Sequence, residues 1–138
     1  MKTQVYDNMF RTTIICIDSY ENRVPSGRIY NMYLDSGIAF RSTMELLKCM
    51  DSMLEEMNYP QSFSGRRVFW QSEMNAQPEK APNSLKTGKK ATFSLRILFR
   101  QNASWQGSIV WHEGKKEESF RSVLELLLLM DSALSVEA

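Results

Sequence analysis

The sequence predicts an α+β protein built from one β-β-β-α unit used twice, with antiparallel strands and two helices. The first observation is a repeated phrase, because FRSTMELLKCMDSML at 40–54 returns as FRSVLELLLLMDSAL at 120–134. The second observation is that each phrase follows three short segments with strand-like patterns, separated by turn residues. We expect the two copies, about 13–54 and 93–134, to be related by a pseudo-two-fold axis.

The repeat extends well beyond the phrase. When the chain is compared with itself at an offset of 80 positions, Gly27 meets Gly107 and Ile29 meets Ile109 without a gap. Ten of the fifteen positions of the phrase are identical. A constant offset over about forty residues indicates a duplicated supersecondary unit. The length of 138 residues suits one compact domain, with a first copy at 1–57, an arm and linker at 58–92, and a second copy at 93–138.

The strands are predicted from alternating hydrophobicity. The second copy opens with FSLRILF, in which Phe93, Leu95 and Ile97 alternate with polar residues, as in a half-buried strand. We expect the strands to join into one six-stranded sheet with both helices on one face, or to form two facing layers. The other expected elements of the two copies are turns at 21–27 and 101–107, second strands at 28–34 and 108–113, and third strands ending at Phe40 and Phe120.

Each helix is predicted to begin with a capping box, in which a serine accepts from the amide three residues on and a glutamate reaches back to the N-cap amide. The two boxes are Ser42 with Glu45 and Ser122 with Glu125. The apolar stripes are Leu46, Leu47, Met50 and Leu54 in one helix, and Leu126, Leu127, Met130 and Leu134 in the other. The second helix adds Val123, Leu124, Leu128 and Leu129, so we expect it to be more deeply buried or covered by a partner.

Two repeated charges have no local explanation. Asp51 and Asp131 lie in the last turns of the helices, where the helix dipole disfavours a negative charge. Arg41 and Arg121 precede the two helices. We expect these residues to be structural, with Arg41 bonded to Asp131 and Arg121 bonded to Asp51 across the pseudo-two-fold axis.

The segment between the copies carries the candidate partner-binding residues. Its first part, NYPQSFSGRRVFW, interleaves aromatic residues with arginines, which is typical of nucleic-acid binding, of protein-binding hot spots and of an arm that packs on its own domain. Its second part, NAQPEKAPNSLKTGKK, is typical of a solvated linker. The candidate partner-binding residues are Arg66, Arg67, Phe69, Trp70, Lys86, Lys89 and Lys90, with Trp105 at a predicted turn tip of the second copy.

Composition excludes several classes of protein. The chain is 43% hydrophobic and 24% charged with a net charge of +1, so it is neither disordered throughout, nor an acidic nucleic-acid mimic, nor a uniformly basic coat. The start MKTQVYDNMFR carries no apolar signal segment, and Leu126 to Met130 is too short to span a membrane. We therefore expect a cytoplasmic protein with two reduced cysteines, Cys16 and Cys49.

The sequence favours a protein without catalytic activity. His112 is the only histidine and lies on a predicted strand, without companions at metal-binding spacing. No glycine-rich phosphate loop or nucleophile elbow is present. We expect no metal and no cofactor.

The segments NASWQGSIVW, SFRSVLELLLLMDSAL and MNYPQSF resemble a family of small proteins from conjugative and other mobile elements of Gram-positive bacteria, with the motif FRSxxELLxxMDSxL. The resemblance is strongest over 93–134 and brings no catalytic residues with it. Proteins of this kind often interfere with host defence. The resemblance therefore implies a non-catalytic, anti-CRISPR-type inhibitor that binds a nucleic-acid-dependent host nuclease of the Cas9 type or its guide-RNA complex.

Two other classes of function stay open. One is a nucleic-acid-binding accessory or regulatory protein that acts on single-stranded DNA or RNA through 63–90. The other is a protein-interaction module that dimerises through its second helix. Direct nucleic-acid binding would weaken steeply as salt rises, whereas binding to a protein would survive moderate salt.

Overall fold

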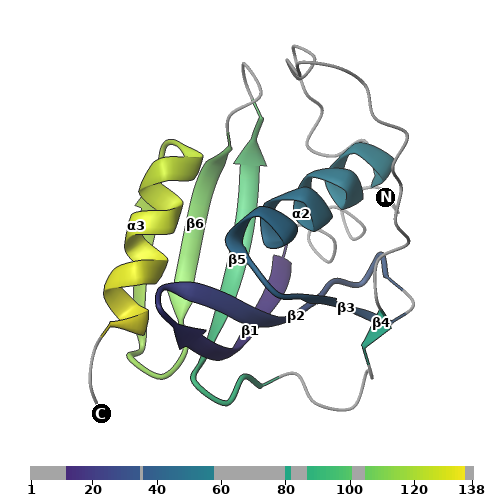
Figure 1. The fold of residues 1–138 in the computed structure, drawn as a ribbon. Helices are drawn as coiled ribbons and strands as arrows, with labels where there is room; N and C mark the ends of the chain where they lie inside the picture. Colours follow the sequence, from purple (N-terminus) through teal and green to yellow (C-terminus); the bar gives the residue numbers. More distant parts are fainter. Residues whose placement is uncertain (1–11, 35, 58–79, 82–86, 101–104, 136–138) are drawn as a thin grey trace.

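The chain folds as an α+β protein with one antiparallel sheet and two helices in the computed structural model (Figure 1). The structure describes residues 12–34, 36–57, 80–81, 87–100 and 105–135. The elements are β1 Thr12–Glu21, β2 Val24–Tyr30, β3 Gly37–Phe40, α2 Thr43–Met57, β4 Lys80–Ala81, β5 Ala91–Phe99, β6 Gln106–Trp111, β7 Lys116–Phe120 and α3 Val123–Leu134.

The sheet has the strand order β4-β3-β2-β1-β5-β6-β7, in which β4 is a two-residue strand at one edge. The two long central strands, β1 and β5, pair antiparallel, with Ile15 opposite Phe93. Each central strand continues outward through a second and a third strand of its own half of the chain. The single sheet, and not two facing layers, is therefore the arrangement adopted.

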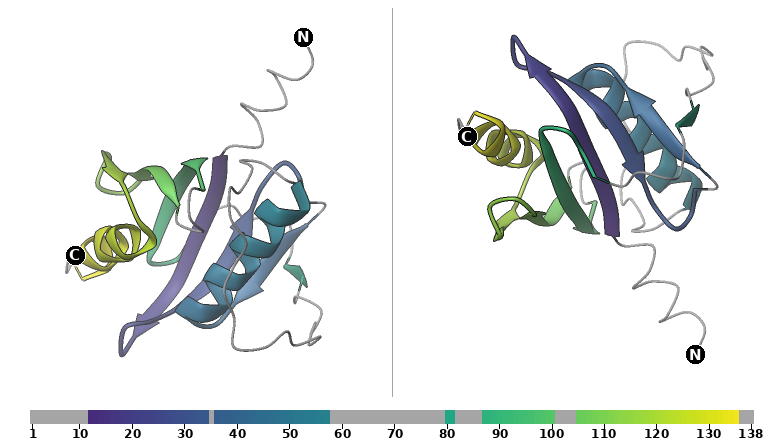
Figure 2. Two further views of the ribbon diagram at one scale, coloured as in Figure 1. Left: turned by 90° about the horizontal axis from the view of Figure 1, so that it is seen from above. Right: turned by 90° about the horizontal axis from the view of Figure 1, so that it is seen from below.

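Both helices cover the same face of this sheet, as the views from above and below also show (Figure 2). Alternate residues of the central strands, such as Ile15 and Leu95, are 1% exposed and point into one buried cluster. The helices contribute Leu46, Met50, Met53 and Leu54 from α2 and Leu126, Met130 and Leu134 from α3. Burial of this shared apolar surface is the main stabilising contribution.

The first hairpin is tighter than the sequence predicted. Asn22 and Arg23 have positive φ angles of 55° and 61°, and Glu21 pairs with Val24 across them. A two-residue loop of this kind matches the twist of antiparallel strands. The strand β2 therefore begins at Val24, four residues before the expected start, and takes in part of the expected turn.

Both helices begin with the predicted serine caps. The amide of Glu45 donates to Oγ of Ser42 at 3.1 Å, and the amide of Glu125 donates to Oγ of Ser122 at the same distance. The glutamates reach one residue further back than expected, because Oε1 of Glu45 accepts from the amide of Arg41, at 2.9 Å, and not from the N-cap amide. Glu125 does the same with the amide of Arg121 at 2.8 Å.

Two parts of the predicted linker are hydrogen-bonded to the sheet. Lys80 and Ala81 form β4, which pairs with β3. The amides of Lys89 and Lys90 donate to Asp18 Oδ1 and to the carbonyl of Ile17, at 3.0 and 2.8 Å. The prediction of a linker is therefore wrong at 80–81, which form a strand, whereas the side chains of Lys89 and Lys90 are exposed although their amides bond to the sheet. In the described part of the chain, neither helix has the length and hydrophobicity that a membrane span requires.

Candidate partner-binding surface

Most of the predicted partner-binding residues, namely Arg66, Arg67, Phe69, Trp70 and Lys86, lie outside the described residues. Lys89 and Lys90 are described and exposed, beside Ile17 and Asp18 of β1.

Trp105 is buried, at 4% exposure, so its prediction as an exposed contact residue is wrong. It directly precedes β6 and belongs to the buried cluster between the sheet and the helices. Pro25, which stands 80 positions earlier, is buried as well. An apolar residue is therefore buried at this position in both halves of the chain.

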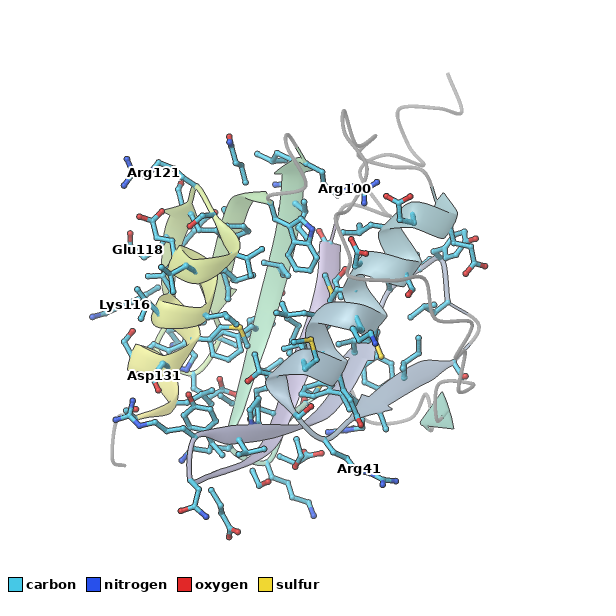
Figure 3. The ribbon with its side chains drawn as sticks, turned by 45° about the horizontal axis from the view of Figure 1, so that its top comes forward. Arg41, Arg100, Lys116, Glu118, Arg121 and Asp131 are labelled. Atoms are coloured by element: carbon cyan, nitrogen blue, oxygen red, sulfur yellow. The ribbon has the colours of Figure 1, made fainter. Side chains whose placement is uncertain are left out.

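Asp131 has partners other than the predicted Arg41. Its Oδ1 accepts from the hydroxyl of Tyr20 at 2.6 Å, and its Oδ2 lies 3.1 Å from Nη1 of Arg23. Arg41 lies well away from Asp131, near the start of α2 (Figure 3). The predicted pair of Arg41 with Asp131 is therefore wrong, because the tip of the first hairpin reaches α3 and supplies both donors.

Arg121 bonds to Glu125 on its own helix, with Nη2 and Oε2 3.0 Å apart, in place of the predicted Asp51. Asp51 instead lies 3.9 Å from Nη1 of Arg100, a side chain that is 3% exposed. The same nitrogen donates to Oε1 of Glu55 at 2.9 Å. The Arg100 guanidinium therefore links the residue that follows β5 to the C-terminal half of α2 (Figure 3).

The helix aspartates nevertheless bridge the two halves of the chain, as the sequence suggested. Asp131 in the second half contacts Tyr20 at the end of β1. Asp51 in the first half contacts Arg100, which stands 80 positions after Tyr20. The donors at the matching positions 20 and 100 are a tyrosine and an arginine, so the repeated cations Arg41 and Arg121 do not identify them.

The outer face of α3 is apolar and exposed. Leu124 and Leu128, both on α3, keep 66% and 58% of their surface accessible. Of the two alternatives that the sequence left open for this helix, deeper burial is therefore wrong for these two leucines, and cover by a partner stays a prediction. The corresponding positions of α2 carry Met44 and Lys48, and both are exposed. The buried positions 46, 50 and 54 of α2 correspond to 126, 130 and 134 of α3, so the fold does not require leucine at 128.

The face of the sheet away from the helices carries a polar cluster. The guanidinium of Arg28 donates to both carboxylate oxygens of Asp18, at 3.0 and 3.2 Å, and to the carbonyl of Thr87 at 2.9 Å. Its charge also lies 5.8 Å from the ring centre of Tyr30. These bonds hold residue 87 against the sheet, which assigns the cluster a structural role.

Ser94 and His112 form the geometry of a nucleophile and a base, with Oγ and Nε2 2.6 Å apart. Acyl transfer also requires an orienting carboxylate and oxyanion donors around the serine. The nearest carboxylate in the chain, Glu113, uses Oε1 to accept from the amide of Thr92 at 2.8 Å. We assign the pair to a cross-strand hydrogen bond on the open face of the sheet.

The thiols are poor nucleophiles at neutral pH. Burial raises the pKa of Cys16 to about 11 against the attraction of Arg28, and burial also raises the pKa of Cys49. Within the described residues, no group of three or more potential metal ligands occurs.

Comparison with known protein families, with curated proteins and with solved structures finds no match to this chain.

Replacing Tyr20 by Phe tests the contact between the first hairpin and α3. Burial, followed by the hydrogen bond to Asp131, raises the pKa of Tyr20 to about 12, whereas an exposed tyrosine titrates near 10. The native chain keeps this proton where the unfolded chain loses it. The stabilisation that protonated Tyr20 contributes to the fold is therefore complete below pH 10 and is lost as the pH rises to about 12.

We expect the Tyr20→Phe protein to be less stable at neutral pH by about 1 kcal/mol, because one hydrogen bond is lost. Its stability should also fall less steeply above pH 10 than that of the wild type. Urea unfolding across this pH range measures both effects. Tyr33, whose pKa is also raised, titrates in both proteins and cancels in the difference. Parallel pH profiles for the two proteins would contradict the assignment.

Proposed function

We propose that this protein is a non-catalytic protein-binding module whose binding surface is the outer face of α3. The observation that carries the proposal is the exposure of Leu124 and Leu128, at 66% and 58%. Exposed apolar side chains that are contiguous on a rigid element are typical of protein-interaction surfaces. A fixed helix also loses little conformational entropy on binding.

The helix α2 provides an internal reference for this surface. The two helices share a capping serine, a glutamate and the buried positions that correspond at an offset of 80. Lysine stands at position 48 of α2, where α3 carries Leu128, so a polar residue is compatible with this position of the fold. The leucine therefore carries a role that the fold does not supply.

We further propose that the target is a nucleic-acid-dependent host nuclease and that the protein is an inhibitor of the anti-CRISPR type. Support comes from the resemblance of 93–134 to mobile-element proteins, and 93–134 includes the whole of α3. Lys89 and Lys90, exposed beside β1, are available for contact with guide RNA at the edge of such a complex.

The test is cleavage of DNA by a guide-loaded Cas9-type nuclease in the presence of the purified protein. We expect the wild type to inhibit cleavage, and the Leu128→Lys protein to require at least about tenfold more protein, because a charge replaces an apolar contact. The Met44→Ala protein is the control, since it removes an apolar side chain of comparable exposure from α2. Absence of inhibition by the wild type would refute the target, and equal inhibition by the Leu128→Lys protein would refute the surface. Binding that is lost at moderate salt would indicate a nucleic-acid-binding protein instead.

We also propose that the two halves of the chain are duplicated units related by a pseudo-two-fold axis. The pairing of β1 with β5 supports this, because Ile14 lies opposite Ser94, the residue 80 positions later. The register irregularities support it too, since one follows Ile17 in β1 and the other follows Ile97 in β5. Expression of 87–138 alone tests the idea, and a folded homodimer with two β5 strands paired at its centre is the expected outcome.

A further inference from the structure

We propose that the outer face of α3 binds the outer face of α3 in a second copy of this chain, with the two helices antiparallel. The inference rests on the proposed function in one respect, namely that this face is a binding surface. It goes further by naming a second copy of this chain as an alternative occupant of the face, in competition with the nuclease, and by naming the register.

A narrow stripe on the outer side of α3 has the spacing of a helix pair, with Arg121, Leu124 and Leu128 exposed and Asp131 partly exposed at its end. Arg121, Leu124, Leu128 and Asp131 are separated by three, four and three residues. Residues at this spacing share one side of a helix, and repeated spacings of three and four are typical of two helices that pack along each other. Arg121 precedes the first residue of α3, but its bond to Glu125 holds its side chain along the first turn.

The stripe is complementary to itself in one direction only. An antiparallel pair centred on residue 126 places Leu124 opposite Leu128 of the second copy. The same register places Arg121 opposite Asp131 of the second copy, so opposite charges meet at both ends. A parallel pair would place Arg121 opposite Arg121 of the second copy and would bring the two aspartates together. Charge and the helix dipoles therefore both favour the antiparallel pair.

The positive and negative charges at each end of the helix pair stay equal in number when the existing ion pairs are included. Arg121 brings Glu125, 3.0 Å away, and Asp131 brings Arg23, 3.1 Å away. Each end of the helix pair would then hold two cations and two anions. The arginine side chains are 85% and 73% exposed, so both can reach across to the second copy without leaving a buried position.

The other helix lacks this complementarity. An α2 pair in the same register would place Met44 opposite Lys48 of the second copy, and would set a charge in the middle of the contact. On α3, charged residues instead lie at the margins, with Lys116 and Glu118 of β7 flanking the helix at the sheet edge (Figure 3). An apolar centre with a polar rim is the usual composition of a protein interface.

The contact is small, because each copy contributes one helix of 12 residues. Stable complexes bury roughly 1,200 Å² or more, so we expect a reversible dimer with a dissociation constant on the order of 100 µM. Sedimentation equilibrium over a range of concentrations measures it. We expect the Leu128→Lys protein to stay monomeric and the Met44→Ala protein to dimerise as the wild type does.

Disulfide trapping tests the register directly. In a Cys49→Ser background, the Leu124→Cys and Leu128→Cys proteins are prepared separately, oxidised alone and oxidised as a mixture. The antiparallel register predicts that the mixture cross-links several-fold more than either protein alone, because positions 124 and 128 face each other only between unlike copies. Equal cross-linking of each protein alone would overturn the register. A wild type that stays monomeric at millimolar concentration would overturn the dimer.

These outcomes separate the inference from the proposed function. A monomeric wild type whose nuclease inhibition is still lost on Leu128→Lys substitution would refute self-pairing and leave the binding surface in place. A dimer that is abolished by Leu128→Lys, together with unchanged inhibition by that variant, would support self-pairing and place nuclease binding on another surface.

Discussion

Substitution of Gly107 by Ala is expected to lower the free energy of unfolding by at least about 3 kcal/mol, because a methyl group has no room at this position. A Cβ atom at 107 would overlap the carbonyl oxygen of Arg96 on the neighbouring strand and lie 2.9 Å from its carbonyl carbon. Both atoms belong to the backbone of β5, so a change of side-chain rotamer cannot relieve the overlap. Relief requires β6 to move away from β5 and thereby to weaken the ladder of hydrogen bonds.

Gly27 provides an independent repetition of this experiment. A Cβ there would overlap the carbonyl oxygen of Cys16, and Gly27 pairs with Phe40 as Gly107 pairs with Phe120. We expect Gly27→Ala to have an effect of the same size. Ser108→Ala is the control, since Ser108 adjoins Gly107 on the half-buried outer face of the sheet and alanine removes atoms there. A change below about 1 kcal/mol at either glycine, measured by urea unfolding, would show that the sheet absorbs the methyl group without strain.

The sequence was sufficient where the chemistry is local. The capping serines Ser42 and Ser122 act through an amide three residues away, so spacing alone identifies them. The alternation in 93–97 reports which side chains face the core, because successive residues of a strand point to opposite faces. The sequence shows only that glycine recurs at 27 and 107. The reason that glycine is required there is a backbone carbonyl on the neighbouring strand, which the sequence does not reveal.

The candidate site was less predictable, because its contacts join residues far apart in the chain. Tyr20 and Asp131 are 111 positions apart and meet only because the first hairpin is long enough to reach α3. The burial of Trp105 was likewise hidden, since a turn tip and a strand start have similar composition. The lysine at the matching position 48 indicates that Leu128 differs from its counterpart on the other helix. The sequence left open whether deeper burial of α3 or a partner explains this leucine.

Truncation of Phe93 to Ala is the second large effect that we expect, at about 3–5 kcal/mol of unfolding free energy. Phe93 is 1% exposed, and it lies in β5 opposite Ile15 of β1 and opposite Trp111 of β6. Its ring occupies the core at the junction of the two halves, where residues from both helices belong to the same buried cluster. The substitution removes apolar contacts and leaves a cavity that the paired central strands prevent from collapsing.

The position of Phe93 also predicts that the two halves of the chain unfold cooperatively. Because β1 and β5 share one core, we expect the Phe93→Ala protein to unfold in a single transition at lower urea concentration, with circular dichroism and tryptophan fluorescence coinciding. Leu98→Ala is the matched control, because Leu98 lies on the same strand but is 39% exposed, and we expect a change below about 1 kcal/mol. Two separated transitions in the Phe93→Ala protein would mean that each half carries its own core. The single buried cluster argues instead that neither half keeps its stability once the junction is weakened.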